Sequence, residues 1–326
     1  MAMRRITSVD DGPRLTVSQL VKSPTLVPKR IIQMAGQGFM VDQLLRQGPP
    51  IPGGSLIFSE SEPLYADEGP MNVEEFGEIP LTTTSTGEMR VAKSVKKALG
   101  FRISQESIDR NNFDKVQQDM VKLKNSFAKT YEDVFLTALL AALPTLASTN
   151  TADGWVGTAA STAGQGIYAD LSHAVYNIRN ADADTSNGTG EQKFHFVPDT
   201  IVLNDMMATK LLLNPDIAKV LGVGDAATRN PLITGDATEA FLKAFNLRLI
   251  RSWRLSPDKA IILQSKVIGG VSDERPLGAT PLYEHKPTET WRTDVTRMSA
   301  VFIDQPKAGL VLTGINDGSA SIANFS

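Results

Sequence analysis

Cysteine is absent from this 326-residue sequence. The absence excludes disulfide bonds, thiolate metal sites and a cysteine nucleophile, so a covalent link between chains would need other chemistry. Histidine is scarce as well, since His173, His195 and His285 are the three examples. None of them belongs to a His-Glu-x-x-His helix and no pair has the spacing of a zinc site, so we expect no bound metal.

The sequence also lacks long apolar runs and a large net charge. No stretch of eighteen apolar residues occurs and the first residues lack the apolar core of a secretory signal, so we expect a protein made and kept in a cytoplasm, with no membrane span. The formal net charge of −3 argues against a dedicated nucleic-acid binder, because affinity for phosphates comes from clustered Lys and Arg. The length is enough for one large or two medium domains with a buried core.

Signatures of catalysis are missing too. The chain has no Gly-x-Ser-x-Gly elbow and no Gly-Lys-Ser/Thr phosphate loop. A calcium loop starting at Asp182 fails, because its sixth position is Asn187 and its twelfth is Lys193, where Gly and Glu are needed. The Gly-Val-Gly-Asp-Ala-Ala segment at 222–227 follows no strand and precedes no crossover helix, which excludes a dinucleotide site. We therefore predict no enzymatic activity and no cofactor.

What the sequence does contain is a stretch, residues 55–103, in which charge is sorted by sign. Residues 59–89 carry no Lys or Arg and residues 90–102 carry no acid. The acidic residues of the first part are Glu60, Glu62, Asp67, Glu68, Glu74, Glu75, Glu78 and Glu88. The basic residues of the second part are Arg90, Lys93, Lys96, Lys97 and Arg102.

We interpret this stretch as a projecting two-armed ribbon that another subunit completes. Apolar residues from Met89 to Ile103 recur at period two, but Lys93 and Lys97 interrupt the same face. A hairpin without a core of its own is marginally stable alone. Two arms of roughly 20 residues would reach ~60 Å, beyond a small domain. The alternatives are an ordinary solvated hairpin or a disordered acidic loop.

The ribbon leads into one long helix. Apolar residues recur at steps of three, four or seven across residues 113–143, which is the period of an amphipathic helix. Asn112 is a candidate N-cap and Pro144 marks the end. Such a helix would be about 46 Å long.

The rest of the chain predicts helices and strands in blocks, which indicates an α+β protein. Residues 1–35 are locally basic and interrupted by prolines, as in an extended arm. We expect His195 to face solvent between Phe194 and Phe196, and we interpret Trp155, Trp253 and Trp291 as packing residues. Helices are predicted near 31–45, 168–179, 206–213 and 238–245, and strands near 194–203, 247–252, 260–268, 290–303 and 309–312.

The order of several motifs resembles the major capsid proteins of tailed bacteriophages, which have the Hong Kong 97-like fold. The motifs are Glu-Phe-Gly-Glu-Ile-Pro at 75–80, Ala-Leu-Gly-Phe-Arg-Ile-Ser at 98–104 and the long helix that follows. Further along come Thr-Ile-Val-Leu-Asn at 200–204, Asn-Pro-Asp at 214–216, and residues 297–304 leading into Lys-Ala-Gly-Leu-Val-Leu at 307–312. The resemblance covers residues 31–314.

The resemblance implies four parts. They are an N-terminal arm (1–35), a peripheral domain with the spine helix (36–54, 104–149 and 286–306), an extended loop (55–103) and an axial domain (150–285 and 307–326). The loop 222–231 would lie nearest a five- or six-fold axis, with Gly222, Gly224, Asp225 and Arg229 as its candidate contacts. The acidic tip would dock on a basic surface of an adjacent copy, and residues 90–102 would meet an acidic one.

The function implied is that of a structural subunit. Its copies would assemble as hexamers and pentamers into an icosahedral capsid, built in the host cytoplasm, that encloses double-stranded DNA. The implied partners are identical subunits, DNA bound without sequence preference at the inner surface, and scaffolding, portal and decoration proteins. The closest alternative is the shell of an encapsulin-like nanocompartment, and a more remote one is a soluble α+β enzyme.

The sequence departs from the resemblance in two respects. Some members of the family join subunits through a Lys–Asn isopeptide bond, but residues 64–79 here contain no Lys and residues 284–315 contain no Asn. We therefore expect no such crosslink. The arm reaches the ribbon within 54 residues and has no long helical scaffolding segment, so we expect any scaffold to be a separate protein.

Overall fold

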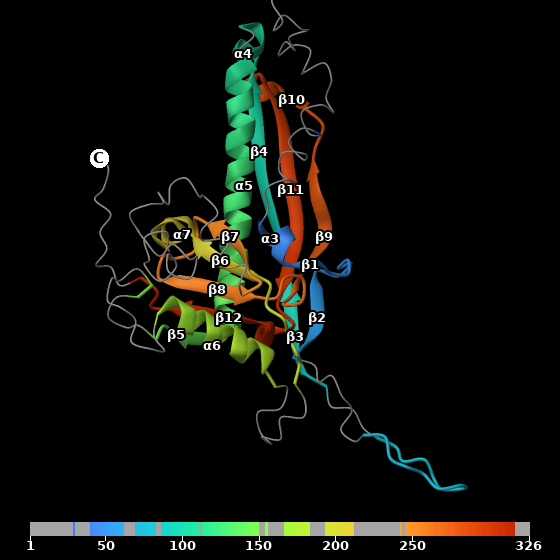
Figure 1. Ribbon diagram of the computed structural model, residues 1–326. Helices are drawn as coiled ribbons and strands as arrows, with labels where there is room; N and C mark the ends of the chain where they lie inside the picture. Colours follow the sequence, from blue (N-terminus) through green and yellow to red (C-terminus); the bar gives the residue numbers. More distant parts are fainter. Residues whose placement is uncertain are drawn as a thin grey trace, which may run out of the picture.

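A single long helix, α5 (Phe113–Ala142), spans the molecule and joins its two hydrophobic cores (Figure 1). Met120 and Phe127 are buried in one core, while Phe135 and Leu139 are buried in the other. The spacing of these residues confirms the predicted amphipathic helix. The computed structural model describes residues 29, 40–61, 69–82, 86–110, 113–149, 154–155, 166–182, 193–211, 242 and 245–316.

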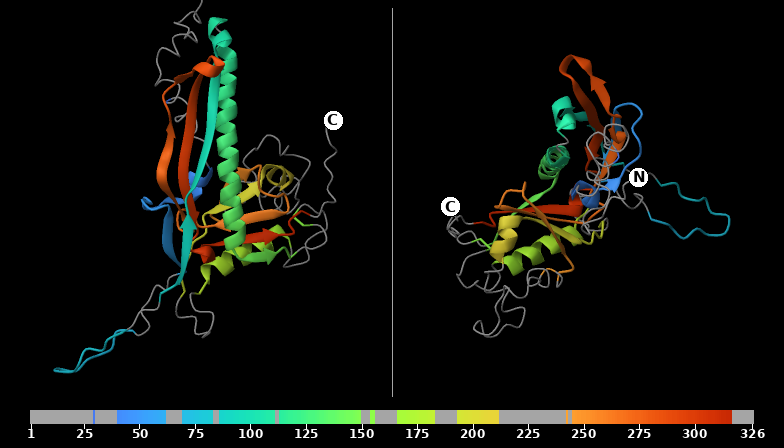
Figure 2. Two further views of the ribbon diagram at one scale, coloured as in Figure 1. Left: turned by 180° about the vertical axis from the view of Figure 1, so that it is seen from behind. Right: turned by 90° about the horizontal axis from the view of Figure 1, so that it is seen from above.

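The first core lies between α5 and a long sheet. In this sheet β1 (Arg46–Gln47), β9 (Gly270–Ala279), β11 (Thr290–Phe302) and β10 (Tyr283–His285) follow in that order, and β4 (Val95–Ser104) also pairs with β11. The antiparallel register of β4 with β11 runs over ten residue pairs. The sheet and α5 lie side by side over much of their length (Figure 2). The buried residues between them are Phe101, Ile103, Val116, Met120, Leu123, Phe127, Tyr131, Leu282 and Val295.

The second core surrounds a five-stranded sheet near the other end of α5. Its strand order is β5 (Thr145–Ala147), β12 (Gly309–Thr313), β8 (Lys259–Leu263), β6 (Thr200–Asn204) and β7 (Arg248–Ser252). Every residue of β6 is buried, which is typical of a strand covered on both faces. The helices α3 (Met40–Leu44), α6 (Ile167–Arg179) and α7 (Asp205–Lys210) contribute buried residues to this core.

A two-stranded ribbon leaves the body at the end of the long sheet. It pairs β2 (Ser55–Glu60) with β3 (Glu88–Lys93) in antiparallel register. One residue, Ser94, separates β3 from β4, and the Ser94 N–H donates to the carbonyl of Gly54 at 2.8 Å. Residues 69–82 lie far from the body in every view (Figures 1 and 2).

The shorter elements stand at the ends of the long sheet. Helix α4 (Gln105–Asp109) joins β4 to α5 and is capped by Ser104, whose hydroxyl accepts from the Ser107 N–H at 3.4 Å. Two short 3-10 helices lie just before strands of the two sheets. Lys286–Thr288 precedes β11, and Pro306–Ala308 precedes β12. Among the described residues, no helix is both long and apolar enough to cross a membrane.

Most of the predicted helices and strands that fall on described residues are confirmed, although the strand predicted at 260–268 ends at Leu263. Strand β9 was not predicted, because its sequence carries Asp273, Glu274 and Arg275 followed by Pro276. The strand expected from residue 194 begins at Thr200, since His195 adopts a left-handed backbone with φ of 54°. The helix predicted at 238–245 lies almost wholly outside the described residues.

The histidine and tryptophan predictions have mixed outcomes. His195 is exposed while Phe194 and Phe196 are buried and stack with ring centroids 5.0 Å apart, as predicted. Trp155 is buried and its Nε1 donates to Asp170 Oδ2 at 2.7 Å. Trp253, predicted to pack, is instead 84% exposed.

Candidate functional site

The tip of the ribbon, residues 69–82, is the most exposed described part of the chain that carries large apolar side chains. Phe76 is fully exposed, Leu81 is 92% exposed and Ile79 is 76% exposed. The carboxylates of Glu74, Glu75 and Glu78 are exposed in the same segment. Apolar side chains concentrated in this way mark an interaction site.

The tip has a defined turn at residues 74–77. The Gly77 N–H donates to the carbonyl of Glu74 at 2.8 Å, and Phe76 has a φ of 68°, which matches the positive φ at the third position of a type II turn. A Cβ on Gly77 would lie 2.8 Å from Val73 Cγ1 and 3.0 Å from the Glu74 carbonyl oxygen. A larger residue at position 77 would therefore have to displace the Val73 side chain, and the turn leaves Phe76 fully exposed.

One face of the ribbon carries apolar side chains that no described part of the chain covers. Ile57 lies opposite Val91 and Ser59 lies opposite Met89 in the β2–β3 register, so Ile57, Val91 and Met89 share a face. All three side chains are exposed, as is Val95 where β4 begins. We call Ile57, Met89, Val91 and Val95 the ribbon face. Its exposure means that the chain leaves apolar surface for another molecule to bury.

Some of the sorted charges of the ribbon are bound by residues of the same chain. Because the arms run antiparallel, Arg90 reaches Glu60 and also donates to Glu88 Oε2 at 3.1 Å. The side chain of Lys97 leaves the ribbon and lies over the Tyr131 ring of α5, with Nζ 5.2 Å from the ring centroid. Burial lowers the pKa of Lys97, and the charge of Asp133 raises it. Arg90 and Lys97 therefore bind within their own chain, while Lys93 and Lys96 are exposed and form no ion pair with any described residue.

A charged cluster ties the long sheet to α3 and α5. Arg297 of β11 is buried and forms two hydrogen bonds with Asp273 of β9, at 2.9 and 3.1 Å. Asp42 of α3 approaches the same guanidinium at 3.9 Å, and the guanidinium lies 5.1 Å from the Tyr131 ring centroid. Burial raises the pKa of both Asp42 and Tyr131, against the lowering effect of Arg297. One cation thus ties together α3, α5, β9 and β11.

A second set of contacts fixes β2 against β11. Phe58 packs on Phe302 with ring centroids 5.5 Å apart, and the Ser61 N–H donates to the carbonyl of Asp304 at 2.8 Å. Arg46 pairs with the Asp304 carboxylate and lies 5.7 Å from the Phe302 ring centroid. Burial raises the pKa of Asp304, and the charge of Arg46 lowers it. The ribbon is therefore a firmly rooted projection.

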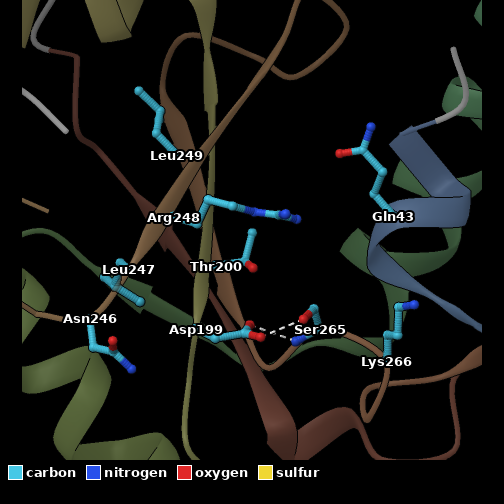
Figure 3. A pocket seen from close by; sticks show the side chains of 9 residues that line it. All are labelled: Gln43, Asp199, Thr200, Asn246, Leu247, Arg248, Leu249, Ser265 and Lys266. Carbon is cyan, nitrogen blue, oxygen red and sulfur yellow. Dashed lines mark hydrogen bonds between the residues drawn. The ribbon is translucent and has the colours of Figure 1, made fainter. Parts of the chain in front are cut away.

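A cavity of about 470 Å³, lined by both polar and apolar residues, opens between α3 and β7 (Figure 3). Asp199 lies at its floor and accepts hydrogen bonds from the backbone N–H of Ser265, at 2.7 Å, and from its hydroxyl. Arg248 extends across the cavity toward Gln43, and Lys266 lies below Gln43 (Figure 3). We call it the Arg248 cavity. The described part of the chain has no group of three or more acidic or histidine side chains placed to hold a metal ion.

The predicted contact residues are distributed as follows. Glu60, Glu74, Glu75, Glu78, Arg90, Lys93, Lys96 and Lys97 all lie on the ribbon or where it joins the body. The remaining predicted residues, Glu62, Asp67, Glu68, Gly222, Gly224, Asp225 and Arg229, lie outside the described residues. Sequence reasoning missed the apolar side chains of the tip and the ribbon face. The alternation of Met89, Val91 and Val95 was the available signal for the ribbon face, which no core of the described residues covers.

Comparisons with known proteins identify one family by its sequence model and several solved structures with a similar fold. A family model for phage capsid protein matches residues 87–312. The capsid of Cyanophage P-SCSP1u has 13% sequence identity and a TM-score of 0.55, covering 84% of this chain and 88% of that one. A virus-like particle from Pyrococcus furiosus has 14% identity and a TM-score of 0.53, covering 88% and 97%. A structure from Microbacterium phage Oxtober96 has 10% identity and a TM-score of 0.54, covering 96% of both chains. No curated protein matches the sequence.

Proposed function

The chain belongs to the phage capsid protein family, and from this premise we propose that its copies assemble as hexamers and pentamers into an icosahedral shell around double-stranded DNA. Its role as a structural subunit of a virion capsid follows from the family, and its fold is the α+β Hong Kong 97-like capsid fold. The finer proposal concerns the arrangement of the copies and what they enclose.

The observation that carries the proposal is the exposure of the ribbon. Its tip presents Phe76, Ile79 and Leu81 to solvent, and the ribbon face adds exposed aliphatic side chains. Burying one such side chain is worth about 1.5–3 kcal/mol. A second subunit that covers tip and face together would therefore gain several such increments, whereas each screened surface ion pair adds ~0–1 kcal/mol. Apolar burial supplies most of the affinity, and the charges guide which surfaces meet.

The architecture supports a division into four parts. In the proposed subunit, α5, β1 and β11 belong to the peripheral domain (36–54, 104–149 and 286–306), and β6, β7, β8 and β12 belong to the axial domain (150–285 and 307–326). Strands β9 and β10 fall in the axial range but pair within the long sheet, and β5 falls in the peripheral range but pairs with β12. The extended loop (55–103) lies over a neighbouring copy, and residues 1–35 form an arm. Strand β4 packs its Phe101 and Ile103 against α5, so the part of the loop that lies in β4 (95–103) serves the fold of its own subunit.

The proposed contents of the shell are DNA, held without sequence preference. The net charge of −3 gives the chain little overall attraction for phosphates. We therefore place DNA at the inner surface as cargo, with scaffolding, portal and decoration proteins as separate partners. Assembly in a host cytoplasm is part of the same proposal. The subunit is proposed to act by binding its own copies, without a catalytic step.

A second candidate function is the shell of a cellular protein compartment, which is favoured by the fold likeness to the virus-like particle from Pyrococcus furiosus. Electron microscopy of purified particles distinguishes the two. Shells with hexamers, together with nuclease-protected DNA in infected cells, support the phage capsid. Small cages filled with protein support the compartment, and a chain that stays monomeric at high concentration contradicts both.

A further inference from the structure

We propose that the Arg248 cavity is the receptor for the acidic turn 74–77 of a second copy of the chain. The proposal rests on the proposed function, because it requires copies to lie side by side. It assigns a ligand to a cavity that is otherwise unexplained, and it names the surface that receives the tip of the ribbon.

The lining of the cavity carries two cations and one carboxylate. Arg248 and Lys266 are exposed cations that line it, and neither forms an ion pair with another described residue. Asp199 is the acidic residue in the lining, and its carboxylate already accepts two hydrogen bonds from Ser265. The amides of Gln43 and Asn246 add further donors to the wall (Figure 3). The cavity therefore offers positive charge and N–H donors, which suits a carboxylate.

Two residues in the wall of the cavity have a left-handed backbone conformation. Asn246 and Lys266 have φ values of 60° and 61°, in the left-handed region. This conformation is uncommon for Lys, and residues held in it cluster at binding sites. The Lys266 N–H donates to the carbonyl of Leu44 at 2.7 Å, which fixes this residue to the end of α3. The wall is thus held in place before any ligand arrives, and this reduces the ordering cost of binding.

The turn at residues 74–77 carries acidic side chains, which match the positive charge of the cavity. Glu75 occupies the second position of a turn closed by the hydrogen bond from Gly77 to Glu74, so its carboxylate is carried at the extremity of the projection. No Lys or Arg occurs between residues 59 and 89 to neutralise the turn. The cavity volume of about 470 Å³ is that of a small-molecule site, which admits a narrow turn. A DNA duplex, whose major groove alone is ~12 Å wide, is too broad to enter it.

The occupant is a second copy because the tip of a chain projects away from its own body (Figures 1 and 2). One tip and one cavity per chain form a heterologous pair, in which each subunit gives one contact and receives one. Head-to-tail contacts of this kind close into rings when the rotation between subunits allows it. The pair of surfaces therefore suits the proposed hexamers and pentamers.

Disulfide trapping tests the contact directly, since the natural chain has no cysteine. In assembled particles of Glu75→Cys/Arg248→Cys, mild oxidation should give a ladder of linked chains on a non-reducing gel. The matched control is Glu75→Cys/Arg275→Cys, because Arg275 is also an exposed arginine but lies outside the cavity lining. Particles that form but give no ladder, or an equal ladder with the control, overturn the inference. Failure of the unmodified chain to form any particle would instead overturn the proposed function.

A charge exchange gives a second test that does not depend on oxidation. Arg248→Glu/Lys266→Glu should slow particle formation about tenfold or more at low salt, as charge reversal at a steered interface does. Adding Glu74→Lys, Glu75→Lys and Glu78→Lys to the same chain should restore much of the rate. No restoration counts against the contact. Variant particles that assemble at the normal rate but lose packaged DNA would show a phosphate site and overturn the inference.

Discussion

Arg297 and Asp273 face each other across β11 and β9 and share two parallel hydrogen bonds, from Nε to Oδ1 at 2.9 Å and from Nη2 to Oδ2 at 3.1 Å. This fork-to-fork geometry is specific to arginine and a carboxylate. It lies where α3, α5 and both strands meet. One buried cation therefore contacts residues from two helices and two strands of the same subunit.

Replacing Arg297 should destabilise the subunit strongly. Arg297→Met leaves Asp273 and Asp42 without their cation, and removing one partner of a buried pair costs about 3–5 kcal/mol. Arg297→Lys should also lose stability, because lysine lacks the planar fork. Urea unfolding of the unassembled chain, followed by circular dichroism, measures the change in free energy of unfolding.

The matched control is Arg292→Met on the same strand. Arg292 pairs with Asp294 at 2.8 Å, but its side chain is about half exposed, so the loss should be below about 1 kcal/mol. Equal losses for the two variants would show that the Arg297 cluster has no special structural role.

Polar substitutions in the tip should block assembly and leave the fold intact. Phe76→Asn keeps a residue that tolerates positive φ, and Leu81→Ser replaces a side chain that is 92% exposed. The free energy of unfolding should change by less than about 0.5 kcal/mol, as at most surface sites. The concentration needed for particle formation, measured by light scattering, should rise about tenfold or more, since each side chain contributes ~1.5–3 kcal/mol of burial.

Phe127→Ala is the control for the tip variants, because it should lower the stability of the subunit itself. Phe127 is buried in the core between α5 and the long sheet, so its truncation should cost about 3–5 kcal/mol of stability. If the tip variants lowered the free energy of unfolding to a similar extent, the tip would belong to the fold of its own subunit.

The basic residues of the ribbon should separate into two classes. Lys93→Glu/Lys96→Glu should slow assembly with unchanged stability, because both side chains are exposed and unpaired among the described residues. Lys97→Glu should instead lower the stability of the chain by about 1–2 kcal/mol, through loss of the cation–π contact with Tyr131. Differential scanning fluorimetry and light scattering on both variants would reveal whether the classes differ.

The Asp304 carboxyl should make stability fall as pH rises. Burial raises its folded pKa above the unfolded value, against the lowering effect of Arg46, so the folded state holds the proton longer. Its stabilising contribution is complete below the unfolded pKa and is lost as pH rises through the folded pKa. The difference in free energy of unfolding between the natural chain and Asp304→Asn should therefore shrink with rising pH, by at most ~1.4 kcal/mol per pH unit. A difference that grows with pH would contradict the sign.

Particles should contain no covalent links between chains. Residues 64–79 have no Lys and residues 284–315 have no Asn, so these two segments cannot supply a Lys–Asn isopeptide pair. Boiling particles in detergent should release single chains on a denaturing gel. A ladder of oligomers that survives boiling and reduction would refute the prediction.

The sequence predicted the parts of the fold that depend on local periodicity and left out those that depend on distant contacts. The apolar period across residues 113–143 identified α5, and the run at 200–204 identified β6, because both patterns are local. Strand β9 has a polar sequence with Pro276 and is stabilised by pairing with β11. Its pairing partner lies in a separate segment, so no local pattern indicates it.

The candidate site was predicted in outline by the same kind of local signal. Sorted charge and the missing core indicated a projecting ribbon, which the structure has. The antiparallel pairing that turns Arg90 toward Glu60 could not be anticipated from a count of charges, and neither could the placement of Lys97 over Tyr131. The Arg248 cavity combines side chains from α3, from β7 with the residues just before it, and from the segment after β8, so only the fold brings its residues together.

The junction at Ser94 has a mechanical consequence. Because β3 continues into β4 after this one residue, tension applied to the tip runs along the axis of β4. Strand β4 is held to β11 by ten antiparallel residue pairs, and a load along the strand must break these together in shear instead of peeling them apart one at a time. Internal pressure that pulls neighbouring subunits apart would thus be borne by the whole length of the ladder, which suits a wall that must resist bursting.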